Sequence, residues 1–185
     1  MKDKNNVFWC SSCLNMSTRN RIEFDDRGRC NACVWNEEKK TLNWNPREAE
    51  FLSLIEKHRK NDPSKFDVIV PVSGGKDGSY VAWKMRNKYN LNVLCVTVHP
   101  PLRSEIGHRN LEKFKIHSGF PLIEINPPYE ISRDLNRRGF VEQGRPLYGW
   151  TTSIFTSVMR IAKYFDVSLI MYGEDGEIEY GGATE

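Results

Sequence analysis

The sequence predicts an α/β fold with an open, parallel sheet that helices cover on both faces. From residue 66 onward, short apolar runs of strand length alternate with segments whose apolar residues recur at helical spacing. Strands separated by helices pair in parallel through right-handed crossovers. A glycine-rich polar stretch follows the first of these strands, and parallel sheets bind ligands at that end of their strands.

The first expected helix covers residues 46–60, ahead of the sheet. Asn45 can cap it, Pro46 suits its first turn, and Asn61–Ser64 (NDPS) ends it. Its apolar face consists of Phe51, Leu54, Ile55 and His58. We expect this segment, within residues 46–62, to link a small N-terminal domain to the sheet.

Four later segments are expected to be strands because they are short and rich in β-branched residues. They are residues 66–72, 92–98, 121–125 and 167–172. Helices are expected at 79–89, 104–118, 129–143 and 151–165, with a loop at 144–150. Inward-facing positions are Val81, Met85 and Tyr89 in the first of these, and Ile154, Phe155, Val158, Ile161, Ala162 and Phe165 in the last.

Composition excludes some classes of protein. The chain has 185 residues, 39% of them hydrophobic, so a core can form, and its net charge is only +3. A nucleic-acid partner is not expected, because such proteins usually carry a clustered basic face. No apolar run is long enough to span a membrane, and residues 1–6 do not open a signal peptide. We therefore expect a cytoplasmic protein without a membrane partner.

Residues 1–45 are polar and contain two CxxC pairs with sixteen residues between them. The pairs are Cys10 with Cys13 and Cys30 with Cys33. Two such knuckles can close a tetrahedron around Zn²⁺, and a closed four-cysteine site is structural. The expected domains are thus a zinc ribbon at 1–45 and the sheet at 63–185. Disulfides or an iron–sulfur centre are the alternatives.

The stretch after the first strand, Ser73 to Ser79, reads SGGKDGS. Glycines let a ligand approach the backbone closely, and the N–H groups at a helix start bind anions such as phosphate. Lys76 adds positive charge, and Asp77 could hold Mg²⁺ on the phosphates. The P-loop and dinucleotide fingerprints are both absent. The alternative is a tight turn with incidental polar residues.

This stretch resembles the PP-loop, SGGxDS, of the ATP pyrophosphatase superfamily, which has an adenine-nucleotide alpha-hydrolase-like fold. Gly78 departs from that pattern, and the hydroxyl follows at Ser79. With the CxxC pairs, residues 145–165 and 172–182 make the chain similar to one branch. This branch comprises the N-acetyl sugar amidotransferases of bacterial surface-polysaccharide (lipopolysaccharide, O-antigen) and flagellin-sugar pathways.

The resemblance implies an enzyme that adenylates the acetamide oxygen of a sugar, with ATP and Mg²⁺, and releases AMP and pyrophosphate. Ammonia from a separate glutaminase partner would then give an acetamidino sugar. Lys76, Asp77 and Glu174 would be catalytic, with Asp77 on magnesium. The nucleotide would be bound by Ser73, Gly74, Gly75, Lys76, Asp77, Gly78, Ser79, His99 and Gly173.

Some of these roles have alternatives. His99 could instead be a turn histidine, and Glu174 with Asp175 a solvated acidic turn. Arg133, Arg137, Arg138 and Arg145 either contact a substrate diphosphate or form a solvated face. Cys95, in the middle of a strand, is expected to be a buried, inert thiol rather than a sulfur carrier.

Two other functions compete with this one. They are a PP-loop tRNA thiolation enzyme and a non-catalytic zinc protein that senses nucleotide. The chain ends just past the fourth expected strand, so we expect the sheet domain to be incomplete at its C-terminus.

Overall fold

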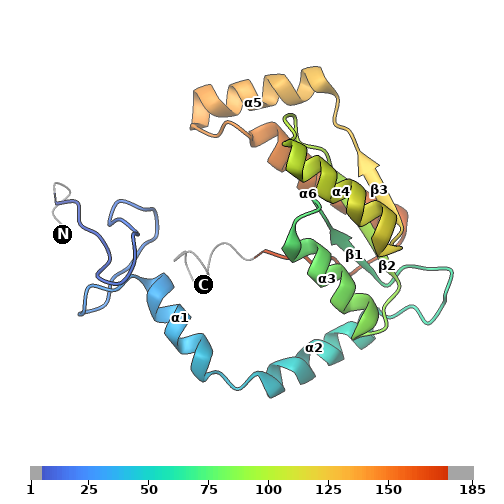
Figure 1. Ribbon diagram of the computed structural model, residues 1–185, viewed down its shortest axis with the longest axis horizontal. Helices are drawn as coiled ribbons and strands as arrows, with labels where there is room; N and C mark the ends of the chain where they lie inside the picture. The colour runs from blue at the N-terminus through green and yellow to red at the C-terminus, as the bar shows by residue number, and fades with distance from the viewer. Residues whose placement is uncertain (1–5, 175–185) are drawn as a thin grey trace. The chain divides into compact units, whose positions relative to one another are not determined.

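The computed structural model describes residues 6–174 (Figure 1). These residues fall into two compact units, divided between Leu52 and Ser53. Each unit is taken by itself below. No helix within residues 6–174 has the length and apolar character needed to cross a bilayer.

The N-terminal unit combines two short antiparallel contacts with helices. Trp9 pairs with Met16, and Phe24 pairs with Cys30. Helix α1 (Asn31–Thr41) begins directly after Cys30, whose carbonyl accepts hydrogen bonds from the N–H groups of Cys33 and Val34. No helix was expected here because the segment lacks an apolar stripe. Its glutamates and lysines favour a helix by intrinsic propensity alone.

Helix α2 (Trp44–His58) begins earlier than the sequence predicts. The Asn43 side chain accepts a hydrogen bond from the Asn45 N–H at 3.1 Å, so Asn43 takes the capping position expected for Asn45. Only Ile55 of this helix is buried, and Leu54 is exposed.

The second unit contains the expected parallel sheet. Strands β1 (Val68–Pro71), β2 (Val93–Val98) and β3 (Leu122–Ile125) lie in the order β1-β2-β3, with Val70 beside Cys95 and Thr97 beside Glu124. All six residues of β2 are buried, as befits a central strand. The α/β fold class with a parallel sheet is confirmed.

The fourth expected strand, residues 167–172, is shorter than predicted. Only Ile170 forms a bridge, in parallel to Ile69 of β1, on the edge away from β2. Two hydrogen bonds hold it: Ile69 N–H to Leu169 O, and Met171 N–H to Ile69 O. The N–H of Val167 still bonds to helix α6, so few residues remain for a strand.

Helices α3 (Lys76–Asn87), α4 (Glu105–Ser118), α5 (Tyr129–Gln143) and α6 (Tyr148–Tyr164) follow the strands. The core on one face of the sheet joins α6 to β1 and β2. It comprises Ile69, Leu94, Val96, Val158, Ala162 and Val167. Side chains alternate along a strand, so Val70 of β1 and Cys95 of β2 face the other side of the sheet. Helix α3 also packs on β1 and β2.

Two of these helices differ from the sequence prediction. Helix α3 starts at Lys76 and not at residue 79, and it buries Ala82 while Val81 is only half-buried. Helix α6 starts at Tyr148, because Asn136 of α5 accepts hydrogen bonds from the first N–H groups of α6. Phe155 of α6 points outward and is 56% exposed.

Candidate nucleotide and metal sites

The loop Ser73–Gly75 joins β1 to α3 at the carboxyl edge of the sheet. Gly74 has a φ of 80°, and a Cβ there would lie 2.7 Å from the Leu111 nitrogen of α4. Only glycine fits this close approach. The loop thus brings the first N–H groups of α3 to a position without intervening side chains, which suits an anion.

The hydroxyls of the loop also contact its backbone. The Gly75 N–H donates to Ser73 Oγ at 3.4 Å, and Ser79 Oγ donates to the Gly75 carbonyl at 2.7 Å. Ser79 therefore fixes the first turn of α3, while its oxygen lone pairs remain able to accept.

Gly78, where the resembled motif has a hydroxyl residue, lies tight against the preceding strand. A Cβ at Gly78 would come within 2.7 Å of the Pro71 carbonyl oxygen. A Cβ at Gly173 would come within 2.8 Å of the Asp77 carbon and the Gly78 nitrogen. The segment after Ile170 therefore runs along the start of α3. Gly173 lies against the first turn of α3 and Glu174 follows it, whereas Asp175 lies outside the described residues.

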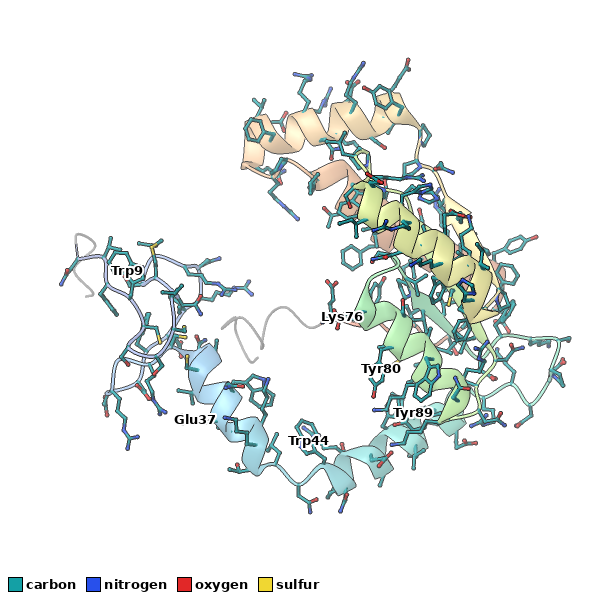
Figure 2. All side chains as sticks on the ribbon, in the orientation of Figure 1. Trp9, Glu37, Trp44, Lys76, Tyr80 and Tyr89 are labelled. Atoms are coloured by element: carbon teal, nitrogen blue, oxygen red, sulfur yellow. The ribbon has the colours of Figure 1, made fainter. Side chains whose placement is uncertain are left out.

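Lys76 and Asp77 form an exposed ion pair at the start of α3, where Figure 2 labels Lys76. Lys76 Nζ lies 2.7 Å from Asp77 Oδ1, and the two side chains are 87% and 49% exposed. Exposed pairs contribute little stability, so the ion pair between Lys76 and Asp77 costs little to break. Asp77 offers a carboxylate for a cation beside the anion-binding N–H groups.

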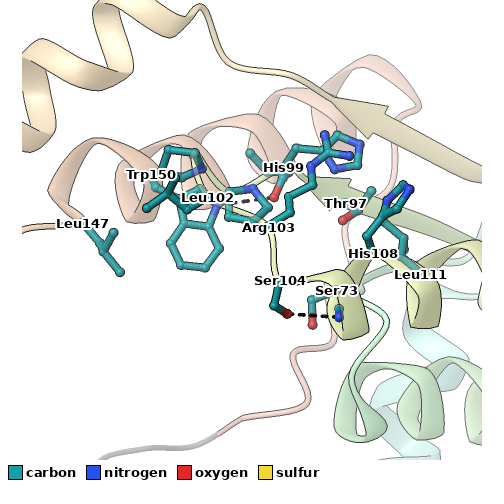
Figure 3. A pocket seen from close by; sticks show the side chains of 14 residues that line it. Ser73, Thr97, His99, Leu102, Arg103, Ser104, His108, Leu111, Leu147 and Trp150 are labelled. Atoms are coloured by element: carbon teal, nitrogen blue, oxygen red, sulfur yellow. Dashed lines mark hydrogen bonds between the residues drawn. The ribbon is translucent and has the colours of Figure 1, made fainter.

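Three cavities lie at this edge of the sheet, and the loop residue Ser73 lines two of them. The large cavity, about 460 Å³, is mostly apolar, and Figure 3 shows Ser73, His99, Leu102, Arg103 and Trp150 around it. A strand-end cavity of about 210 Å³ is lined by Ser73, Gly78, Trp150, Gly173 and Glu174, among others. A side cavity of about 170 Å³ is lined by His99, Arg103, Asn126, Tyr129 and Trp150, among others. The large cavity has the size of small-molecule sites.

Trp150 lines all three cavities, and the sequence analysis did not identify it. Its indole Nε1 donates to the Val98 carbonyl at 3.3 Å, and its backbone N–H donates to Asn136 Oδ1. Both bonds hold the ring over the end of β2. In the sequence, Trp150 is a tryptophan near the start of a helix, and that position alone does not indicate a ligand-binding role.

His99, at the end of β2, is buried and is not an exposed turn residue. Its Nε2 lies 2.9 Å from Glu124 Oε2, and Lys115 Nζ lies 2.8 Å from Glu124 Oε1. The hydrogen bond from Lys115, and then the one from His99, lower the pKa of Glu124 despite partial burial. Glu124 and Lys115 had no predicted role.

The arginine segment lies on and after α5. Arg133 pairs with Asp134, and Arg145 lies over the Tyr148 ring at 5.1 Å. The linings of the three cavities include neither these residues nor Arg137 and Arg138. Within residues 6–174, the structure therefore does not place these four arginines in the cavities near the loop.

Cys95 is fully buried in β2, and burial raises its pKa to about 12. The thiol is therefore protonated at neutral pH and a poor nucleophile. This agrees with the expectation of an inert thiol.

The four N-terminal cysteines come together. Their Sγ atoms lie within 4.8 Å of one another, with Cys10 to Cys33 at 3.8 Å and Cys13 to Cys30 at 3.6 Å. All are free thiols, so the disulfide alternative is not observed. Zn–S bonds of about 2.3 Å place the sulfurs of a tetrahedral site about 3.8 Å apart. The spacing fits one Zn²⁺, whereas a four-iron cluster would hold its ligand sulfurs farther apart.

Backbone N–H groups surround these sulfurs. Burial raises the pKa of Cys10, but N–H donors from Cys30, Ser12 and Cys13 lower it to about 6. The Cys30 sulfur also accepts from the Asn15 side chain at 3.4 Å. Such donors stabilise thiolates, the form that binds metal.

Comparisons with known proteins gave distant matches. A scan against protein-family models finds no match. An uncharacterized protein of Methanocaldococcus jannaschii is 24% identical over 171 residues, which cover 90% of this chain. The chain spans 58% of the length of that curated relative.

Among solved structures, one similar chain is the U34-tRNA thiolase NcsA from Methanococcus maripaludis with its 4Fe–4S cluster. The TM-score is 0.46 at 15% identity, and the match covers 92% of this chain and 55% of that one. The position of the loop after β1 fits the PP-loop superfamily that the sequence resembles.

Proposed function

We propose that this chain carries the nucleotide-binding part of an AMP-forming enzyme that activates a carbonyl oxygen with ATP. The observation that supports this most is the loop Ser73–Gly75, which leads into the N-terminus of α3 beside the large cavity. Phosphates suit the loop, and a nucleoside suits the apolar cavity.

In this proposal, the substrate oxygen attacks the α-phosphorus of ATP, and pyrophosphate leaves. The N–H groups at the start of α3, with Lys76, hold the departing phosphates and offset their charge. Asp77 and Glu174 are the carboxylates that would hold Mg²⁺, which would neutralise charge on the phosphates. A nucleophile then attacks the activated carbon and displaces AMP. Positioning does most of this work, and the enzyme needs no nucleophilic side chain of its own.

For the acceptor, we propose the acetamide of an N-acetyl sugar, with ammonia as the nucleophile from a separate glutaminase. The support is chemical: the one cysteine among the described residues of the α/β unit is Cys95, which is buried and protonated. A sulfur carrier is therefore missing from this part of the chain, and ammonia does not need one.

Thiolation of a tRNA base is the second candidate. The four-cysteine centre together with a PP-loop-like sequence favours it, because tRNA thiolation enzymes of this superfamily share that combination. A tRNA thiolase is also among the similar structures, although a TM-score of 0.46 is too low to transfer its substrate. Both candidates use the same adenylation step and differ in the acceptor.

The test is to incubate the full chain with ATP, Mg²⁺ and either an N-acetylated nucleotide sugar or tRNA, and to identify the nucleotide product. AMP with pyrophosphate is expected, and the acceptor that stimulates AMP formation identifies the candidate. Lys76→Ala is a suitable variant because its side chain is 87% exposed and it should fold normally. ADP as the product, or equal AMP formation by Lys76→Ala, would contradict the proposal.

A further inference from the structure

The large cavity has two distinguishable ends. Ser73 lines both this cavity and the strand-end cavity, whereas His99 and Arg103 line both this cavity and the side cavity. If the phosphates occupy the loop, as the proposed function requires, the base of the nucleotide extends toward His99. The inference below rests on that function.

The hydrogen-bond chain behind His99 fixes the proton on its ring. Both oxygens of the Glu124 carboxylate have a partner. Lys115 Nζ contacts Oε1, and His99 Nε2 is hydrogen-bonded to Oε2. An ionised carboxylate only accepts hydrogen bonds, so Nε2 of a neutral His99 must carry the proton. The lowered pKa of Glu124 keeps this carboxylate ionised at neutral pH.

The other ring nitrogen of His99, Nδ1, is then a hydrogen-bond acceptor. Within the part of the chain that the structure describes, it has no hydrogen-bond partner. Among residues 6–174, the one enclosed side-chain polar atom without a partner is Trp35 Nε1, so His99 Nδ1 is not sealed off. His99 lines both the large cavity and the side cavity, so Nδ1 can be reached from the space that these two cavities share.

We propose that His99 selects adenine by accepting a hydrogen bond from the 6-amino group of the base, and that Glu124 acts as the positioning residue that holds the required tautomer. A 6-oxo base such as hypoxanthine presents an oxygen at that place. Two acceptors then face each other without a proton between them, and the site rejects the base. Trp150 supplies an aromatic wall beside the same cavity.

Glu124→Gln tests the role of the tautomer directly. Lys115 Nζ only donates, so it draws the oxygen of the new side-chain amide toward itself and leaves the amide NH₂ facing His99. Nε2 must then accept, and the proton moves to Nδ1. The matched control is Glu112→Gln, which removes the other carboxylate bound by Lys115 but does not contact His99.

The measurement is calorimetric binding of Mg·ATP, Mg·ITP and Mg·pyrophosphate to the full chain. Wild type and Glu112→Gln should prefer ATP over ITP by about tenfold or more, the effect of one hydrogen bond in a closed site. Glu124→Gln should lose that preference through weaker ATP binding, tighter ITP binding or both. Its affinity for pyrophosphate should stay unchanged, which shows that the variant is folded.

Three results would overturn the inference. They are equal binding of ATP and ITP by wild type, an unchanged ATP preference in Glu124→Gln, and equal losses for all three ligands in that variant. The first two would leave the proposed function intact if ATP and pyrophosphate still bind. Failure of wild type to bind either ligand would overturn the proposed function together with this inference.

Discussion

The two units of the chain are held together in different ways. In the N-terminal unit, the buried hydrophobic cluster consists of Cys10, Ile22 and Cys30, and two of these three residues are metal-ligand candidates. The α/β unit has a sheet core, with Ile69, Leu94 and Val96 almost fully buried against helix α6. A metal can replace a core where the apolar area is too small, so the two units should respond differently to the same treatment.

Loss of the metal should have the largest effect. Cys30→Ser, or a strong chelator, should unfold residues 6–41 and leave the α/β unit folded, because structural zinc contributes about 10–16 kcal/mol. Residue-resolved amide exchange with zinc analysis would measure this. The control is Cys95→Ala, which removes a thiol from the other unit and should keep one Zn²⁺ per chain. Protection of residues 6–41 without metal, or iron in place of zinc, would contradict the comparison.

A cavity in the sheet core should have the converse effect. Ile69→Ala removes a fully buried side chain and should lower the free energy of unfolding of the α/β unit by about 2–5 kcal/mol. Zinc content should not change. Ile131→Ala, at a position 59% exposed, is the control and should change stability by less than about 0.5 kcal/mol. Zinc loss in Ile69→Ala would show that the two units are not independent.

A smaller loss should follow from Gly78→Ser, although the resembled motif has a hydroxyl residue there. The new Cβ would meet the Pro71 carbonyl oxygen at 2.7 Å, and overpacking of this kind costs about 1–3 kcal/mol. Ser79→Ala, which removes one exposed hydrogen bond, serves as the control. Denaturant unfolding measures both variants. A Gly78→Ser variant as stable as wild type would mean that α3 can move away from β1.

The smallest effect concerns pH. The pKa of Glu124 is lowered in the folded protein, mainly by Lys115, so its contribution is present above the ordinary value of 4.5 and is lost as pH falls through the lower folded value. Both side chains are about a third exposed, at 30% and 32%, so the contribution is less than about 1 kcal/mol. The stability of Glu124→Gln should therefore fall less than that of wild type between pH 7 and pH 3. An equal fall would assign the acid sensitivity to other groups.

The same contrast explains what could be predicted from the sequence. The sheet and the loop were predictable because β-branched strands and the SGGKDGS stretch have local signatures. The cysteine spacing likewise predicted the convergence of the four sulfurs. Helix α1 was missed because charged residues without an apolar stripe give only a weak helical signal.

The missed parts of the candidate site depend on contacts between distant segments. Asn136 of α5 sets the start of α6 and so the place of Trp150, and no local pattern indicates that bond. Glu124 looks like an ordinary strand residue until β3 pairs with β2 and brings it to His99. The strand at 167–172 was predicted too long because its apolar composition does not show two contacts at its ends. The Val167 N–H bonds to α6, and Gly173, just after the segment, packs against α3.

The most direct test of the nucleotide site is calorimetric titration of Mg·ATP into the full chain and into Lys76→Ala. We predict saturable binding to wild type, weakened about tenfold when the lysine that would hold the phosphates is removed. The folded state of the variant can be checked by its zinc content and thermal unfolding. No binding to wild type, or equal affinity in both proteins, would contradict the assignment of the loop after β1 as the phosphate site.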